Sequence, residues 1–455
     1  MKHPSERLVV LLVASFQFVN ILDFMIVMPL GPQFSSELGI AEHYLGVVAG
    51  IYTLAGAVAG IAGSFFLDRF DRRKALAVSM FGLMSATALG GLAFNLESLL
   101  ASRVLAGIFG GPATSLSLSV IADVIPVQKR GRAMATVMMG FSVASIFGVP
   151  IALELAHIAG WRAPFFGVAA LGLVISASSL YLLPPMKHHF EARLANKQTP
   201  FWEMFTKPLP LLSYASMACM MFSAFTLIPM IPSYVLHNLD YKGEPWLNHA
   251  IQSIGINYTF SALGALYLFG GMASLAMMQI VGRMTDRVGS AVMSWIGGVL
   301  LCGVIYCAFI DYQPWLSVLG IYIAFMGISS LRGVPARTLD TRVPRAHERA
   351  GFMSAQSAVQ HITLAIAASM SSLFLQEAPD KSLVGMPMLG WLSVTFALLL
   401  PVFVTLTERG LKKRDLAQAR AEDAPAPKTP YATPTLAPTA LVDEVPASGN
   451  QPAIR

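Results

Sequence analysis

Twelve apolar stretches, each about 20 residues or longer, dominate this 455-residue chain. A helix needs about 20 mostly apolar residues to cross a bilayer, because the hydrocarbon core is about 30 Å thick. Only 12% of the residues are charged, roughly half the share of a soluble domain. The chain is therefore expected to be an all-α membrane protein. The expected spans are residues 8–30, 44–67, 75–95, 99–123, 131–157, 163–183, 209–236, 258–282, 290–310, 315–338, 351–375 and 385–407.

The spans fall into two groups of six. The first run is too long for the apolar core of a signal peptide and is interpreted as the first membrane helix. A tail rich in Ala, Pro and Thr cannot bury enough apolar surface to order itself, so we expect it to be disordered. The predicted division is a six-helix bundle over 1–183, a connector over 184–208, a second bundle over 209–407 and a tail over 408–455.

Lysine and arginine alternate sharply between the two sets of loops. One set carries nearly all of them, whereas the other set holds only Arg162, Lys242 and Lys381. Basic loops mark the cytoplasmic side. The pattern predicts a bacterial-type inner-membrane protein with both termini in the cytoplasm. The net charge of +6 thus reports topology, and no nucleic-acid partner is expected.

The two groups of spans repeat each other. Asp68-Arg69 matches Asp286-Arg287 at an offset of 286 − 68 = 218, and Pro126 matches Pro344 at 344 − 126 = 218. Parallel repeats of this kind enclose a site between the two halves of many transporters.

The loop after the second span reads Asp68-Arg69-Phe-Asp-Arg72-Arg73. This loop resembles the signature loop of the major facilitator superfamily. The resemblance implies the major facilitator fold, with twelve transmembrane helices in two pseudo-symmetric six-helix bundles. It also implies a cytoplasmic gate in which Asp68 pairs with Arg72 and Asp123. The flanking gate residues are Arg69 and Arg73, and the second half supplies Asp286 and Arg287.

Two details of the gate loops depart from the family pattern. Asp71 stands where the family has a glycine, and we expect it to keep the turn because Asp tolerates left-handed backbone. Ser290 stands in the second half where a basic residue is expected.

Further motifs are similar to those of the drug–proton antiporter branch of that superfamily. Arg103 lies one turn before Gly107 and Gly110, which resembles a second family motif on the fourth helix. Gly148-Val-Pro150 resembles, imperfectly, the glycine-proline motif of proton-coupled exporters. These glycines and the proline are expected to serve helix packing. Asp23 precedes Pro29 on the first helix, as an acid does in the antiporter branch.

Asp23 and Arg103 are ionisable residues inside expected spans, where a charge is costly and usually functional. Counting residues places both at a similar depth, on helices that are neighbours in the implied fold. Burial raises a carboxyl pKa and a nearby arginine lowers it, so movement between the two states would let Asp23 carry a proton. The alternative is a permanent Asp23–Arg103 pair that only braces the helices.

Other polar and aromatic side chains are candidates for lining a substrate cavity. Gln17 and Asn20 share a helix face with Asp23, and His361 either titrates or is satisfied between helices. Glu154 and His157 are expected to be exposed at the membrane interface, and Arg332 and Arg337 to reach the cytoplasm. The candidate cavity residues are Gln17, Asn20, Phe24, Tyr52, Phe141, Phe222, Phe225, Gln356, Gln360 and His361.

The sequence thus predicts a secondary transporter, in which a proton gradient drives the efflux of a small organic molecule. Uptake by proton symport, or sugar-type export, is the alternative on the same fold; a non-transporting membrane receptor is the alternative of another class. No enzyme activity, cofactor or metal is expected, because the three cysteines lack ligand spacing and no phosphate-binding loop is present. A monomer is expected.

Overall fold

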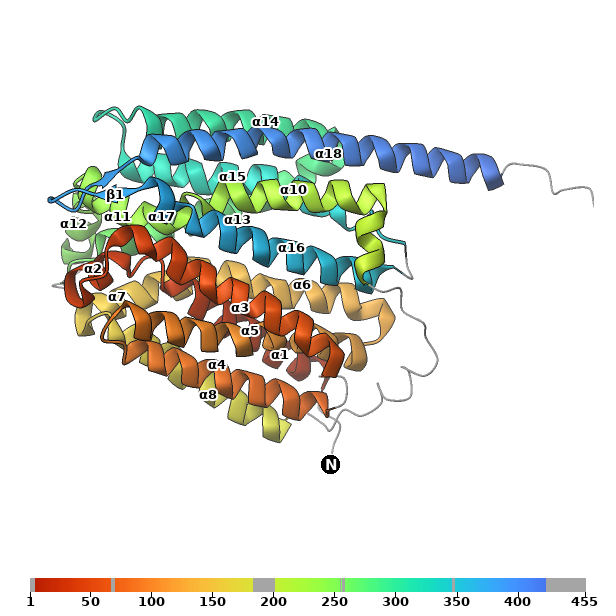
Figure 1. Cartoon of the computed structure of the whole chain (residues 1–455), viewed down its shortest axis with the longest axis horizontal. Coiled ribbons are helices and arrows are strands. Elements are labelled where there is room, and N and C mark those ends of the chain that lie inside the picture. The colour runs from red at the N-terminus through yellow and green to blue at the C-terminus, as the bar shows by residue number, and fades with distance from the viewer. Residues whose placement is uncertain are drawn as a thin grey trace, which may run out of the picture. The chain divides into compact units, whose positions relative to one another are not determined.

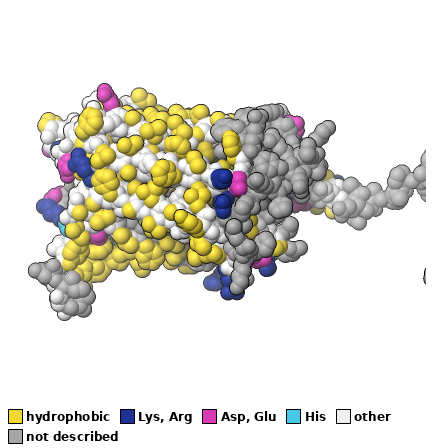
Figure 2. Space-filling view, turned by 90° about the horizontal axis from the view of Figure 1, so that it is seen from below, with side chains coloured by type: hydrophobic (Ala, Val, Ile, Leu, Met, Phe, Trp, Pro, Cys, Tyr) yellow, Lys and Arg dark blue, Asp and Glu magenta, His cyan; other side chains and the backbone are white. Residues whose placement is uncertain are grey.

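The computed structural model describes residues 5–66, 70–182, 201–253, 255, 258–345 and 348–422. Twelve of the helices in these ranges are long and apolar enough to cross a membrane, as predicted. They run side by side in Figure 1. In Figure 2 a broad band of hydrophobic side chains separates two ends, where the Lys, Arg, Asp and Glu side chains gather. The molecule is a multi-pass membrane protein.

The first half contains six spans and several short helices. Ser5 caps the first helix through its hydroxyl, and Asn95 and Ser98 cap the fourth span reciprocally. In chain order its helices are α1 (Glu6–Ile26), α2 (Gly31–Leu38), η1 (Glu42–Tyr44), α3 (Leu45–Phe66), α4 (Arg72–Gly91), α5 (Leu96–Val124), α6 (Val127–Val143), η3 (Ala144–Gly148), α7 (Val149–Ala159) and α8 (Arg162–Leu182).

The second half adds six further spans and one small hairpin. In chain order its elements are η4 (Phe201–Thr206), α10 (Pro208–Phe225), η5 (Ile228–Met230), α11 (Ile231–Ser233), η6 (Tyr234–Asn238), α12 (Pro245–Ser253), α13 (Ala262–Val288), α14 (Ser290–Ile305), η7 (Tyr306–Ile310), α15 (Val318–Asp340), α16 (Arg349–Ser369), α17 (Ser371–Phe374), β1 (Gln376–Glu377), β2 (Leu383–Val384) and α18 (Met386–Glu422). The strands pair antiparallel, with Gln376 opposite Val384.

The second half repeats the packing of the first. Helix α3 packs on α5 and α4 on α5, and in the same way α13 packs on α15 and α14 on α15. The pairs α1–α6 and α10–α16 correspond as well. Corresponding helices form both contacts between the halves. Helix α3 of the first half contacts α16 of the second, and α13 of the second half contacts α7 and η3 of the first. This is the pseudo-two-fold arrangement expected from the sequence repeat.

Two ends of the bundle are distinguished below. The basic end carries the starts of α4, α6 and α10, with Arg72, Lys129 and Lys207. The hairpin end carries η1, η6 and the β1–β2 hairpin, and it lies at the left of Figure 1.

The observed bounds differ from the sequence-based ones in four respects. The chain forms two units, residues 1–411 and 412–455. Helix α18 continues to Glu422, so residues 408–422 are helical although the tail was expected to be disordered. The seventh span is broken at η5 and η6, because Pro229 and Pro232 lack the N–H groups that a continuous helix needs. The eighth span starts at Ala262, four residues later than expected (262 − 258 = 4), behind the capping residue Ser261.

Candidate functional site

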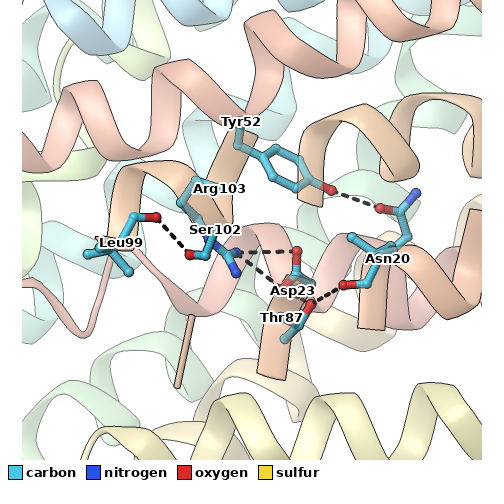
Figure 3. Close-up of polar contacts among 8 residues, drawn as sticks. Asn20, Asp23, Tyr52, Thr87, Leu99, Ser102 and Arg103 are labelled. Atoms are coloured by element: carbon cyan, nitrogen blue, oxygen red, sulfur yellow. Dashed lines mark hydrogen bonds and ion pairs between the residues drawn. The ribbon is translucent and has the colours of Figure 1, made fainter. Parts of the chain in front are cut away.

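A buried ion pair joins α1 to α5. The Nη1 atom of Arg103 lies 3.2 Å from one carboxylate oxygen of Asp23 and 3.4 Å from the other. The two side chains are 1% and 0% exposed. Figure 3 shows the guanidinium pointing at the carboxylate, beside the hydroxyl of Thr87. The structure therefore brings together the two charged residues that the sequence singled out.

Two further helices complete the surroundings of this pair. Thr87 of α4 donates a hydrogen bond of 2.7 Å to Asp23 and also bonds the carbonyl of Leu83. The guanidinium of Arg103 lies over the ring of Phe165 in α8, 5.3 Å from its centroid. The Nε and Nη2 atoms of Arg103 have no hydrogen-bond partner among the described residues. One cation and one neutral donor thus hold the carboxylate, and the cation keeps unused donors.

Asn20 lies one turn before Asp23 on α1 and is fully engaged by other helices. Its amide donates to the carbonyl of Gly110 at 3.2 Å and to Thr114 at 2.7 Å, and it accepts from Tyr52 at 2.9 Å. The prediction that Asn20 faces an open cavity is therefore wrong. Asn20 instead ties α1 to α3 and α5, because three partners satisfy its polar atoms.

A line of aromatic rings leads from this network to the second half. Phe24 stacks on Tyr52 with ring centroids 5.5 Å apart, and it approaches Phe225 of α10 at 6.2 Å. Phe24, Tyr52 and Phe225 are therefore the members of the predicted cavity set that the structure places together, across the two halves.

Other members of the predicted cavity set lie elsewhere. Phe222 stacks on Phe396 of α18 at 4.1 Å, so it faces an outer helix and not Phe24. Phe141 is 54% exposed and lines a small hollow with Ser142, Ser145 and Ser274. These side chains point in different directions because successive positions of a helix lie on different faces of it.

The three polar residues of α16 in the predicted cavity set lie in different surroundings. Gln356 is buried and donates a 2.7 Å hydrogen bond to Asp340, so it is part of the second half's interior. His361 is half-buried, and its Nδ1 lies 2.8 Å from the carbonyl oxygen of Ser357. Gln360 and, on α1, Gln17 are half-buried. Gln17 keeps a buried amide oxygen without a hydrogen-bond partner among the described residues.

The fold and this site can be compared with known proteins. A sequence profile of the Major Facilitator Superfamily matches residues 13–368, which is most of the chain. The chain belongs to the major facilitator superfamily. The family resemblance of the loop after the second span is therefore confirmed.

Several superfamily relatives are informative. A chloramphenicol resistance protein of Streptomyces lividans is 26% identical over 280 residues, which cover 60% of this chain and 65% of the relative. The inner membrane transport protein YdhP of Escherichia coli K12 is 30% identical over 158 residues, 34% of this chain and 41% of the relative. These matches span less than two thirds of either relative.

Among solved structures, a bacterial homologue of the human lysosomal transporter Spinster has the same fold. It was solved in an inward-facing, unoccupied conformation. The two structures agree with a TM-score of 0.66 and 17% identity, over 91% of this chain and 99% of the other.

Two residues of the superfamily signature loop lie outside the described residues. Asp68 and Arg69 lie beyond the described residues, and of Asp123 only the helical backbone is described. Arg72 and Arg73 start α4, where Asp71 caps the helix by accepting the N–H of Arg73 at 2.9 Å. Asp71 has a φ of −59°, so the expected left-handed conformation is wrong and the residue serves as a cap.

The second-half counterparts of this loop are described, and their role in a gate stays a prediction. Asp286 and Arg287 are exposed near the end of α13, and no ion pair within the described ranges includes either of them. The loop in the second half lacks the basic residue that would draw the acid inward, because Ser290 occupies that position.

The superfamily glycines lie where helices cross closely. A Cβ at Gly107 would meet the carbonyl of Tyr52 in α3, and one at Gly110 would lie 2.7 Å from the hydroxyl of Tyr52. A Cβ at Gly148 would lie 2.8 Å from Leu22 of α1. Pro150 follows the π-helical turn η3 at the start of α7. The predicted packing positions thus lie at helix contacts beside the Asp23 site.

Two sequence expectations about charged residues are wrong. Arg332 is 1% exposed and packs in the second half against the backbone near Gly297, so it does not reach an aqueous surface. Arg337, one and a half turns later, is exposed as expected. Glu154 was expected to be exposed, yet it is 14% exposed and hydrogen-bonded to the other half, while His157 is 49% exposed.

Proposed function

We propose that this transporter exports a small organic molecule in exchange for protons, with Asp23 as the proton carrier. The observation that carries the proposal is the buried Asp23 carboxylate, held by one cation and one neutral hydroxyl. A carboxylate in apolar surroundings stays ionised only while a cation is near, and it takes up a proton when the cation leaves. Movement of Arg103 relative to α1 therefore converts helix motion into proton binding and release.

Alternating access supplies that movement. The halves are joined at the hairpin end, where His237 of η6 lies 3.0 Å from Glu42 of η1 and Glu377 of β1 accepts the N–H of Glu42. Contacts at one end of a two-half transporter are consistent with a state closed there. The Spinster homologue was captured in an inward-facing state, which supports this interpretation. Helices α1 and α5 belong to the same half, so the proposal requires that opening the hairpin end changes the contact of Phe24 in α1 with Phe225 in α10 and thereby shifts α1 relative to α5.

The aromatic line Phe24, Tyr52 and Phe225 favours an apolar, ring-containing substrate. Stacked and tilted rings at 5.5 and 6.2 Å give a flat organic molecule surfaces to pack against. The chloramphenicol resistance protein among the relatives supports export of such a compound. We further propose that both termini lie in the cytoplasm, because the basic end carries the Lys- and Arg-rich loops.

The test uses purified protein in proteoliposomes with an imposed pH gradient and chloramphenicol as the probe. Wild-type protein should move chloramphenicol uphill when the gradient is present. Asp23→Asn should lose this pH-driven movement while keeping downhill exchange, because the amide cannot release a proton. Asp23→Glu should keep part of the coupling. Glu97→Gln is the control, since it makes the same carboxyl-to-amide change at an exposed position in the first turn of α5 and should keep full coupling.

Two outcomes would contradict the proposal. Undiminished pH-driven flux in Asp23→Asn would show that another group carries the proton. Uptake of the probe in the same direction as protons would assign symport in place of export. Cells that express the wild type should also tolerate more chloramphenicol than cells that express Asp23→Asn.

A further inference from the structure

Asp340 is a second buried carboxylate, and it lies in the other half of the molecule. It ends α15 at the basic end and is 6% exposed. Ser213 of α10 donates its hydroxyl to one oxygen at 2.5 Å, and Gln356 of α16 donates its amide to the other at 2.7 Å. Asp340 thus joins three helices, with one neutral donor on each oxygen.

The Asp340 carboxylate forms no ion pair within the ranges that the structure describes. The titratable groups that face it are Arg337 on its own helix and Tyr214 on α10. The Arg337 side chain is exposed, and the Tyr214 hydroxyl donates to the carbonyl of Phe352 in α16 at 3.3 Å. The Asp340 carboxylate is therefore held by two neutral hydrogen-bond donors, while Arg337 acts on it through its charge without forming an ion pair.

The surroundings of Asp340 are otherwise apolar. A buried hydrophobic cluster lines α10, α15 and α16 around it, with Leu339, Val343, Phe352 and Ala355 among its members. An isolated carboxylate in such surroundings is costly, whereas the protonated acid is neutral and can donate as well as accept. The contrast with Asp23 is direct, because Asp23 has Arg103 at 3.2 Å.

The repeat explains how the neutral surroundings arise. Asp340 stands four residues before Pro344 (344 − 340 = 4), much as Asp123 stands three before Pro126 (126 − 123 = 3). Arg72 of the first half matches Ser290 of the second, since 290 − 72 = 218. An acid thus stands one position before the match of Asp123 (123 + 218 = 341), whereas the match of Arg72 is a serine. A buried carboxylate without an ion-pair partner binds a proton more readily than one that is paired.

We propose that Asp340 is a proton-binding site at the basic end, held between Ser213 and Gln356 and separate from the Asp23 site. When it is ionised, Asp340 accepts from both neighbours. When it binds a proton from water at the basic end, one oxygen becomes a donor and one neighbour must turn away or accept. Proton binding thus alters the joint between α10, α15 and α16. Its use in the transport cycle rests on the proposed proton-coupled function.

Infrared difference spectroscopy on the full chain in lipid tests the site directly. Spectra taken between about pH 5 and about pH 9 report the carbonyl band of any carboxylic acid that titrates in this window. Asp340→Asn should lose a band that the wild type and Asp23→Asn both show. Asp380→Asn is the matched control, because Ser382 holds the pKa of this exposed acid below its usual range and outside the window. An unchanged band in Asp340→Asn overturns the proposal.

Two milder variants guard against misfolding of Asp340→Asn. Ser213→Ala and Gln356→Leu each remove one donor to the ionised form, so each should raise the midpoint of the band by about one pH unit. A midpoint that stays fixed in both variants also overturns the proposal. Transport is tested separately, since pH-driven chloramphenicol flux decides the proposed function and the infrared band decides Asp340.

Discussion

Glu154 of α7 accepts two hydrogen bonds from Ser261, the residue that caps the start of α13 in the other half. The backbone N–H of Ser261 lies 2.9 Å from Glu154 Oε1 and the hydroxyl lies 2.6 Å from the same atom. The hydroxyl of Tyr258 donates to Glu154 Oε2. A carboxylate at a helix N-terminus also gains from the partial positive charge of that end. This contact fastens the two halves at the hairpin end.

Removing the Glu154 carboxylate should loosen that end. Glu154→Ala should broaden the distance between spin labels placed at the exposed positions Ser36 and Asp380, toward longer values, because the Ser261 and Tyr258 donors lose their acceptor. The measurement is pulsed electron spin resonance on protein in lipid nanodiscs, with Cys219, Cys302 and Cys307 replaced. Ile158→Ala, at an exposed position on the same helix, should leave the distribution unchanged. Equal distributions in both variants would show that Glu154 does not hold the halves.

The Tyr258 side of this contact should be insensitive to pH in ordinary buffers. Burial and the hydrogen bond to Glu154 raise the pKa of Tyr258 to about 12. A raised pKa means that the folded state holds the proton more tightly. The contribution of the Tyr258–Glu154 hydrogen bond to stability is therefore complete below about pH 10. It is lost only as the pH rises toward 12. In Tyr258→Phe the spin-label distances should shift equally at about pH 6 and about pH 9; a shift seen at only one of them would contradict this assignment.

Arg103 should be more important for stability than a surface arginine. Arg103→Ala leaves Asp23 charged, buried and without its cation, which costs about 3–5 kcal/mol. The apparent unfolding temperature in detergent should fall by several degrees and should partly recover when Asp23→Asn is added. Arg162→Ala is the control, because its pair with Glu37 is half-exposed and such pairs contribute about 0–1 kcal/mol. Equal effects of Arg103→Ala and Arg162→Ala would refute the prediction.

The crossing of α3 and α5 should not tolerate one added methyl group. A Cβ at Gly111 would meet the carbonyl oxygen of Gly56 and lie 3.0 Å from its Cα, and backbone cannot move aside as a side chain can. Gly111→Ala should cost about 1–3 kcal/mol, measured as lower thermal stability in detergent. Gly60→Ala is the control on the same helix pair, because a Cβ at Gly60 meets nothing within 4 Å. Wild-type stability of Gly111→Ala would argue against this close crossing.

The aromatic line should separate binding residues from packing residues. Phe24→Ala should raise the KM for chloramphenicol about tenfold, since one lost ring contact is worth about 1.4 kcal/mol. Phe222→Ala should leave KM near the wild-type value, because that ring stacks on Phe396 of α18. The measurement is concentration-dependent flux in proteoliposomes. A larger KM change for Phe222→Ala than for Phe24→Ala would reverse the assignment.

The sequence also located part of the candidate site. Asp23 and Arg103 could be found because a charge inside an apolar span is rare, and counting along two helices gives the depth of each. Glu154 was expected to be exposed and Asp340 was not singled out, since each stands near the end of a span, where a charge is unremarkable. Their partners Ser261, Ser213 and Gln356 are 107, 127 and 16 residues away. No local sequence pattern predicts which residues will form such pairs.

The amino-acid sequence by itself determined the twelve spans, their grouping into two repeats and the superfamily. The spans could be found because a helix that crosses a bilayer has an approximately fixed length, and the repeats because their matching residues lie at a constant offset. Only the tertiary structure decided which polar side chains are hydrogen-bonded to other helices and which charged residues form an ion pair. Asn20 and Asp23 are three residues apart on α1, yet Asn20 is satisfied by α3 and α5 while Asp23 faces Arg103. The rotation and spacing of packed helices set these contacts, and they depend on residues far away in the chain.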